Sequence, residues 1–511
     1  MRRALTVIVF PLLISAASAQ SDQPTAPVLF MEPATSMNPL ARPLYSKVED
    51  RDRLAKYATL LENSAARRAF ALYKLAWEIR QNSAKAQKEM PPYAIALVPG
   101  GNNADIGFRL KTSAGVKSFS KRPYIKLDPS GDGFDITFLH ETGHVVLALL
   151  GADFPNGPKM ASIPHSTAAL TDRMTAFNEG FAIHLETLAA QLAMGEPLSD
   201  RYRHVCVAFG RPELSPGEFY RPLADLCSYS QTLARYYEVR ENHFAFAEAC
   251  REGDYLRVQL DKSRDFSTLR EANQLLQSEG FYAGFFYAWT MRGDKTPDDK
   301  AILERQRRIL RALAQMLAKD DVGPDTAYLL QFVRHYAELF PDERELITDA
   351  FLEITHGVFV DPEAGRLWKD AYAAAMRLEP KANVKANLEA ARSAWRSALR
   401  DDFSRAYSRL GPQIRCRVPD VRVKLVILST DAPLSFDINT VQPGLLKLVP
   451  DLADAEAARW LAERSRQPFA TAEDFLGCVS PNDRVRERLQ MDGPKQSLLV
   501  PTTREHDDAG G

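Results

Sequence analysis

The segment Asp135-Ile-Thr-Phe-Leu-His-Glu-Thr-Gly-His-Val-Val-Leu-Ala-Leu-Leu150 decides the fold of this 511-residue chain. It predicts a helix that begins after Asp135, a residue type that caps helix N-termini well. His140 and His144 are one turn apart on this helix, so both imidazoles can reach one metal ion, and Glu141 is directed toward the same open coordination position. This HExxH pattern is typical of a zinc site that activates water for hydrolysis.

A zinc site of this kind requires a third protein ligand from another part of the chain, because catalytic zinc has three protein ligands and one open position. In the metzincin arrangement a glycine would stand at position 147 and a third histidine at position 150, and both positions hold leucine. A second helix is predicted over residues 176–194, and it carries the sequence NEGFA at 178–182. This helix is a candidate source of the third ligand to a Zn²⁺ ion held by His140 and His144.

The two motifs together resemble those of the aminopeptidase-N-like gluzincins, a family of zinc metallopeptidases. The match covers roughly residues 120–195 and is specific at the two motifs. It implies a zincin-like core, Zn²⁺ held by two histidines and Glu179, and hydrolysis of peptide bonds through a metal-activated water with Glu141 as general base. The 34 residues between His144 and Glu179 exceed the spacing in those relatives, and no GAMEN-like segment precedes the motif, so aminopeptidase specificity is not implied.

Other side chains are candidates for supporting roles. In gluzincins a tyrosine or histidine from a later helix stabilises the oxyanion, and Tyr282, which glycine follows closely, resembles that tyrosine. Tyr287 is the next candidate, and both residues also fit an aromatic core stripe. Glu186 stands seven residues after Glu179 on the same helical face, where it can either hydrogen-bond a ligand imidazole or be exposed. His165 is a weaker candidate, either for contact with substrate or as a substitute metal ligand.

Residues 1–19 are typical of a secretory signal peptide. Two arginines precede an apolar stretch, and Ala17-Ser18-Ala19 fits a small-residue cleavage site. The apolar stretch is shorter than the about 20 residues that span a bilayer as a helix. We therefore expect an exported protein, periplasmic or secreted, with no membrane span after the signal is cleaved.

The composition is that of a folded protein without a charge bias. Hydrophobic residues make up 45% and charged residues 26% of the chain, within the ordinary globular range. The 65 Lys and Arg residues are balanced by 66 Asp and Glu residues, so no bulk charge attracts nucleic acid or an anionic membrane. The expected partner is a peptide or protein substrate.

The five cysteines, Cys206, Cys227, Cys250, Cys416 and Cys478, would be exported to an oxidising compartment in which disulfides persist. Their spacing predicts one disulfide within the first three and another between Cys416 and Cys478. None has CxxC spacing, which argues against a cysteine zinc cluster or a thioredoxin-type redox site.

The segment that starts at Asp437-Ile-Asn-Thr440 and continues for about forty residues resembles helix-hairpin-helix modules of the competence DNA-receptor and minor-pseudopilin type. In DNA-binding versions, glycines in the hairpin let backbone amides approach a phosphate. Here the corresponding positions are Asp451 and Ala453, and a carboxylate there repels phosphate. We therefore expect this module to pack against the protein or contact a protein partner.

Along the chain, the pattern predicts an α+β fold that is mostly α, with short strands at 93–98, 106–110 and 124–128. The expected order is a signal peptide (1–19), a lead-in with N-terminal helices (20–90), a zincin-like catalytic domain with a small sheet (91–300), a helical domain (301–415), a helix-hairpin-helix-like module (416–480) and a disordered tail (481–511).

Two functional hypotheses follow. The first is an exported zinc-dependent metallopeptidase. The second is a non-catalytic envelope protein in which the zincin core is structural and the C-terminal module recruits a partner. A Glu141→Gln variant separates them, since loss of the general base abolishes hydrolysis and leaves the metal ligands in place.

Overall fold

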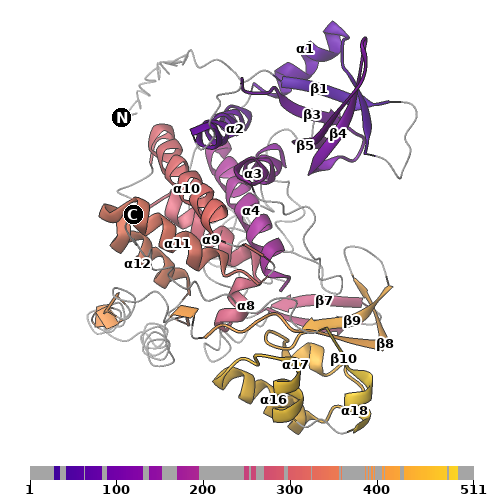
Figure 1. Cartoon of the computed structure of the whole chain (residues 1–511), viewed down its shortest axis with the longest axis vertical. Helices are drawn as coiled ribbons and strands as arrows, with labels where there is room; N and C mark the ends of the chain where they lie inside the picture. Colours follow the sequence, from indigo (N-terminus) through magenta and orange to yellow (C-terminus); the bar gives the residue numbers. More distant parts are fainter. Residues whose placement is uncertain are drawn as a thin grey trace, which may run out of the picture.

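A computed structural model shows a mixed α and β fold that is mostly helical, as the sequence predicts (Figure 1). None of the helices in the described part of the chain is both long and apolar enough to cross a membrane. The signal peptide predicted over residues 1–19 lies outside the described residues. The structure describes residues 28–34, 42–62, 64–82, 89–130, 137–151, 170–194, 247–252, 255–260, 270–292, 297–355 without 321 and 324, 358–359, isolated positions between 386 and 397, 406–425 without 408, 431–479 and 483–492.

A small closed barrel packs against the helices at one end of the molecule (Figure 1). Its strands are β1 (Val28–Pro33), β2 (Leu44–Lys47), β3 (Tyr93–Leu97), β4 (Asn102–Thr112) and β5 (Gly115–Leu127), in the order β1-β2-β4-β5-β3. Side chains along β3 alternate, with Tyr93, Ile95 and Leu97 packed against the helices and Ala94 and Ala96 inside the barrel. The three predicted strands are confirmed, and β4 and β5 are longer than predicted.

The lead-in predicted for residues 20–90 is wrong in one respect, because part of it belongs to the barrel. Strand β1 runs parallel to β3, with Val28 opposite Tyr93, and it buries Phe30 and Met31. Strand β2 pairs with both β1 and β4. The segment is rich in proline and polar residues and lacks a clear alternation, so the partner strands rather than the local pattern make it extended.

The predicted helices around the two motifs are confirmed. Helix α3 spans Thr137–Leu150 and helix α4 spans Arg173–Met194, and the predicted cap at Asp135 lies outside the described residues. Gly151 follows α3 with φ +112°, a conformation that favours glycine. The other helices of this part are α1 (Arg51–Leu60), α2 (Ser64–Asn82), α8 (Ala272–Leu276), α9 (Glu279–Thr290), α10 (Asp299–Lys319), α11 (Tyr328–Leu339), the 3₁₀ helix η4 (Pro341–Glu343) and α12 (Arg344–Thr355).

Two glycines in the motifs let the central helices approach closely. A Cβ atom on Gly143 of α3 would lie 2.9 Å from the Cα of Ala182 on α4. A Cβ atom on Gly180 of α4 would lie 2.5 Å from both the carbonyl oxygen of Glu279 and the Cβ of Tyr282 on α9. The small residues of HETGH and NEGFA therefore allow α3, α4 and α9 to pack at distances that larger side chains would prevent.

Gly180→Ala should destabilise the protein by about 1–3 kcal/mol, because the added methyl group meets atoms of α9 that a rotamer change does not remove. The thermal unfolding midpoint measures this effect. Gly477→Ala on helix α17 (Ala472–Val479) is the control, since a Cβ there meets no atom within 4 Å, and alanine favours a helix over glycine by up to about 1 kcal/mol. Equal midpoints for the two variants would contradict the close contact.

The C-terminal module contains a second sheet, to which an earlier part of the chain contributes (Figure 1). Strand β8 pairs with β7 in parallel and with β9 and β10 in antiparallel fashion. The predicted disordered tail over 481–511 is wrong for its first part, because α18 and β10 are formed there, and the pairing of β10 with β8 explains why. The elements are β6 (Ala247–Glu252), β7 (Tyr255–Leu260), β8 (Arg415–Leu425), β9 (Asp431–Asp437), α15 (Pro443–Leu446), α16 (Asp454–Arg466), α17 (Ala472–Val479), α18 (Asp483–Arg488) and β10 (Gln490–Asp492).

The predicted disulfide between Cys416 and Cys478 is not formed. Cys416 is buried in the core of the module, whereas Cys478 is exposed on α17, so the two side chains occupy different environments. The other predicted disulfide involves Cys206, Cys227 and Cys250, whose side chains lie outside the described residues.

Buried polar contacts join the module to the helical core. Gln277, which follows α8, donates to a carboxylate oxygen of Asp437 at 2.6 Å and accepts from the Thr440 hydroxyl at 2.9 Å. Gln274 on α8 donates to the carbonyl oxygen of Thr440 at 3.0 Å. The Asp437–Thr440 segment, which the sequence places in a separate module, is therefore part of a buried interface.

Candidate metal centre

The three predicted metal ligands meet at one point between two helices. The Nε2 atoms of His140 and His144 on α3 each lie 3.5 Å from the Oε2 atom of Glu179 on α4. One ligand atom from each residue lies within 4.8 Å of the other two, and the two imidazole centroids are 5.1 Å apart. Within the described part of the chain, this is the cluster of His, Cys, Asp and Glu side chains that could hold a metal ion.

A second residue orients each imidazole through its other nitrogen. The Nδ1 atom of His140 lies 3.1 Å from Oε2 of Glu186, and the Nδ1 atom of His144 lies 3.0 Å from Oδ1 of Asn178. Both oxygens accept hydrogen bonds, so each Nδ1 carries a proton and donates it, which leaves Nε2 as the ring atom that a metal ion would bind in place of a proton. This is the tautomer that a metal ligand requires.

The predicted contact of Glu186 with one of the two motif imidazoles, that of His140, is thereby confirmed. Asn178 was not assigned a role by sequence reasoning, although it precedes Glu179 in the same motif. An available signal was its position in the NEGFA segment, because an amide oxygen next to a ligand carboxylate is well placed to accept from an imidazole. Both orienting residues lie on α4, the helix that also provides Glu179.

The site is rich in carboxylates, and the pKa values reflect this. Burial alone would lower the pKa of His140, but Glu179, Glu186 and Glu141 outweigh burial and raise this pKa well above its usual value. Burial alone would also lower the pKa of His144, but Glu179 outweighs burial and raises this pKa. Burial would raise the pKa of Glu179, but the two imidazoles hold it well below its usual range. Because three carboxylates surround the two imidazoles, the cluster attracts a cation. A metal cation would compete with protons for the imidazole nitrogens.

Glu141 lies beside the ligands and is almost completely buried, with 4% of its surface exposed. Burial is the main cause that raises the pKa of its carboxyl group, and a hydrogen bond from the backbone N–H of Ala104 on β4 opposes it. The β4 segment 102–106 pairs with β5 on one side, whereas β2 pairs with β4 at residues 109–111. The other edge of the 102–106 segment therefore faces the site without a strand partner among the described residues.

The predicted oxyanion role of Tyr282 is not supported by its position. Its side chain is completely buried, its ring packs 5.5 Å from that of Phe177, and its hydroxyl donates to the carbonyl oxygen of Leu276 at 3.2 Å. The core interpretation of the aromatic stripe therefore holds for Tyr282, and Tyr287 on the same helix is also buried. His165 lies outside the described residues.

The donor set fits a first-row divalent cation of the zinc type. Two neutral imidazoles and one carboxylate match the ligands of catalytic zinc, and each imidazole has the hydrogen-bond acceptor that such ligands usually have. The cluster contains no thiolate, so its donor set does not match that of an iron–sulfur or structural Cys-type site.

Comparisons with protein-family models, curated proteins and solved structures found no match. The arrangement of the described residues is therefore the observation that bears on function. Its most specific feature is the cluster of His140, His144 and Glu179 with Glu141 next to it.

Removing either orienting residue should weaken zinc binding by about 10–100-fold, as is usual for groups that hold a ligand imidazole. Glu186→Ala and Asn178→Ala each remove one acceptor, and competition with a zinc-sensitive dye measures the dissociation constant. Glu186→Gln is the matched control, because its amide oxygen can still accept from Nδ1 of His140. Wild-type affinity in both alanine variants would rule out the assigned role.

Proposed function

We propose that this protein is an exported, zinc-dependent metallopeptidase with a zincin-like catalytic core. The observation that carries the proposal is the convergence of His140, His144 and Glu179 on one point, with a buried Glu141 beside them. An HExxH helix that receives its third ligand from the next helix supports the gluzincin resemblance. Export rests on the signal-like sequence of residues 1–19.

The roles of the chain's own residues follow from this placement. Zinc, when bound by the two imidazoles and Glu179, would supply a Lewis acid that polarises the substrate carbonyl. Glu141 would accept the proton of the attacking water and return it to the leaving amine. Glu186 and Asn178 would keep both imidazoles aimed at the metal through the reaction.

A peptide substrate is supported by the edge of β4 that borders the site. The backbone of Ala104 touches the Glu141 carboxylate, and the 102–106 segment of β4 has its second edge unpaired among the described strands. An extended peptide can add to such an edge by main-chain hydrogen bonds. This addition would bring the peptide's carbonyl groups next to Glu141.

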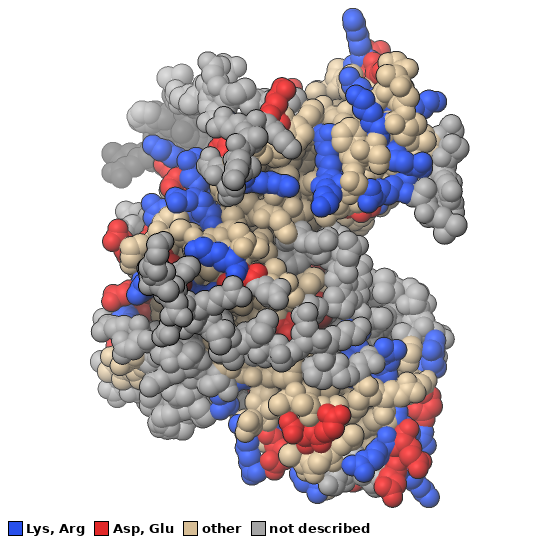
Figure 2. All heavy atoms as spheres, viewed as in Figure 1, with Lys and Arg blue, Asp and Glu red and all other residues tan. Residues whose placement is uncertain are grey.

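The C-terminal module is proposed to contact protein rather than nucleic acid. Asp451 occupies the hairpin with φ +63°, and its carboxylate pairs with Arg488 at 3.2 Å. Positive and negative side chains are interspersed over the module in the view of Figure 2, where no continuous basic face is visible. A phosphate backbone would meet a carboxylate at the hairpin instead of the open amides it requires.

Metal content of the purified protein tests the proposal directly. Wild type should contain one zinc ion per chain by plasma mass spectrometry, and His144→Ala should contain none, because two protein ligands do not retain catalytic zinc. His335→Gln is the matched control and should keep its zinc, since His335 pairs with Asp320 and takes no part in the cluster. If wild type stays metal-free after incubation with zinc, the proposed function fails.

A further inference from the structure

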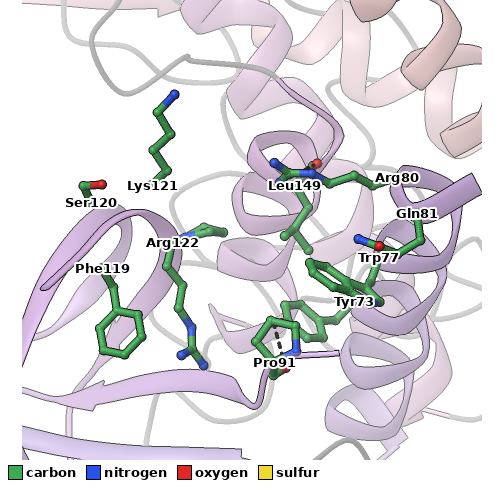
Figure 3. Close-up of a pocket in the computed structure, with 11 residues that line it drawn as sticks. Tyr73, Trp77, Arg80, Gln81, Pro91, Phe119, Ser120, Lys121, Arg122 and Leu149 are labelled. Carbon is green, nitrogen blue, oxygen red and sulfur yellow. Dashed lines mark hydrogen bonds between the residues drawn. The ribbon is translucent and has the colours of Figure 1, made fainter. Parts of the chain in front are cut away.

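A cavity of about 430 Å³ lies between helix α2, the C-terminal end of α3 and strand β5 (Figure 3). Its volume falls in the range of small-molecule sites, which is about 300–1,000 Å³. Helix α3 contributes only Leu149 to the lining, whereas the candidate metal centre uses His140, Glu141 and His144 of the same helix. The cavity is therefore separate from that centre.

The lining carries positive charge without a negative counterpart. Arg80 approaches from α2, and Lys121 and Arg122 come from β5, as Figure 3 shows. Among the described residues, no aspartate or glutamate lines the cavity. Arg80 donates to the carbonyl oxygen of Leu149 at 3.2 Å, which places its guanidinium at the wall of the cavity.

Arg122 is the central group of this site. It donates one hydrogen bond to the carbonyl oxygen of Pro92, its Nε atom is buried without a hydrogen-bond partner, and its guanidinium lies 5.3 Å from the centroid of the Phe119 ring. Burial is the main cause that lowers the pKa of Arg122, and among the described residues Tyr73, not a carboxylate, opposes this effect. The cation is thus partly removed from water without an anion in the described part of the chain to compensate it.

Two buried arginines of the described chain have a carboxylate partner, whereas a third, Arg173, is held by carbonyl and amide oxygens. Arg68 pairs with Asp299 at 2.8 Å, and Arg464 pairs with Glu271 at 3.3 Å. Because buried charges in proteins are usually paired, the lack of a described carboxylate beside Arg122, in a cavity that Arg80 and Lys121 also line, favours an anion from outside the chain as its counterion.

The remaining walls are apolar and aromatic. Tyr73 and Trp77 of α2 form one side, and Phe119 of β5 lies on the other. Such walls bury the hydrophobic body of a ligand, and a few polar groups fix its orientation. We propose that this cavity binds a small organic anion, a carboxylate with an aromatic or aliphatic body, whose charged group pairs with Arg122 and Arg80.

Fluorescence titration with 11-(dansylamino)undecanoic acid, an anionic amphiphile, tests this site in the full-length protein. Trp77 in the wall should transfer energy to the bound dansyl group. The primary amide of the same molecule has the same body without the charge, and it should bind about tenfold more weakly or worse, as loss of a charge-assisted hydrogen bond predicts. The acid should bind with the same affinity after the protein is treated with EDTA and in the His144→Ala variant, because binding in this cavity does not depend on the metal centre. This control also separates the proposal from the proposed zinc site.

Arg122→Gln should weaken binding of the acid about tenfold and leave binding of the amide unchanged, since glutamine can still donate to Pro92 but carries no charge. Arg80→Gln is a second variant, at an exposed position. It should also weaken binding of the acid, and it tests the proposal if Arg122→Gln does not fold. Lys117→Gln on β5, which does not line the cavity, should bind like wild type. Equal affinity for acid and amide, insensitivity to both arginine variants, or no saturable binding up to about 1 mM would overturn the proposal.

Discussion

Replacing Glu141 with glutamine should reduce peptide hydrolysis by about 10²–10⁴-fold, the usual contribution of a positioned general base. Glutamine has nearly the same shape as glutamate, so it fits the buried space and can still accept from the backbone N–H of Ala104. It cannot accept a proton from water. Cleavage of a broad panel of fluorogenic peptides by metal-loaded protein measures the effect.

Zinc content distinguishes loss of the base from loss of the site. Glu141→Gln should retain one zinc ion per chain, because His140, His144 and Glu179 are unchanged. Glu78→Gln on α2, an exposed residue that pairs with Lys74 at 3.9 Å, should keep full activity. If the metal-loaded wild type and Glu141→Gln were equally inactive on every peptide, the envelope-protein hypothesis would replace the peptidase.

Replacing Arg173 with methionine should destabilise the protein by about 3–5 kcal/mol, the usual consequence of breaking a buried charge network. Arg173 is the first residue of α4 and is almost completely buried. Its guanidinium donates to the carbonyl oxygens of Asp325 at 2.6 Å and Gly411 at 2.6 Å and to the side chain of Asn273 at 2.9 Å. Methionine fills the volume but leaves these oxygens without donors.

The same replacement removes a positive charge that interacts with Asp437. Burial is the main cause that raises the pKa of this carboxyl group, and Arg173 is among the groups that lower it. We therefore expect the C-terminal module to detach at lower temperature or denaturant concentration in Arg173→Met than in wild type, as limited proteolysis would show. A destabilised start of α4 would also weaken zinc binding, since Glu179 lies on that helix.

Arg466→Met is the matched control for this prediction. Arg466 is 75% exposed and pairs with Glu463 of the same helix at 2.9 Å, an arrangement worth about 0–1 kcal/mol. Arg173→Lys keeps the charge but loses the planar fork of donors, so its stability should lie between those of wild type and Arg173→Met. Equal unfolding midpoints for Arg173→Met and Arg466→Met would show that the buried network contributes little.

The helices that carry the site could be predicted from the sequence because the residue pattern that specifies each helix lies within the helix itself. The helical spacing of His140, Glu141 and His144 specifies which side chains share a face, and α3 and α4 have nearly the predicted bounds. Strands β1 and β2 could not be predicted in the same way, since their extended form depends on pairing with β3 and β4. The Cys416–Cys478 pairing failed for a related reason, because sequence spacing does not give the distance between thiols.

By itself, the sequence determined the chemistry of this protein's central helix pair: two histidines and a glutamate at helical positions, with a second glutamate next to them. Only the tertiary structure decided which other groups complete the site. It brought Glu186 and Asn178 to the two imidazoles, placed the hydroxyl of Tyr282 in the core and set the edge of β4 over Glu141. The physical reason is that helical periodicity fixes neighbours along one helix, whereas contacts between elements depend on packing, burial and hydrogen bonding across the whole chain.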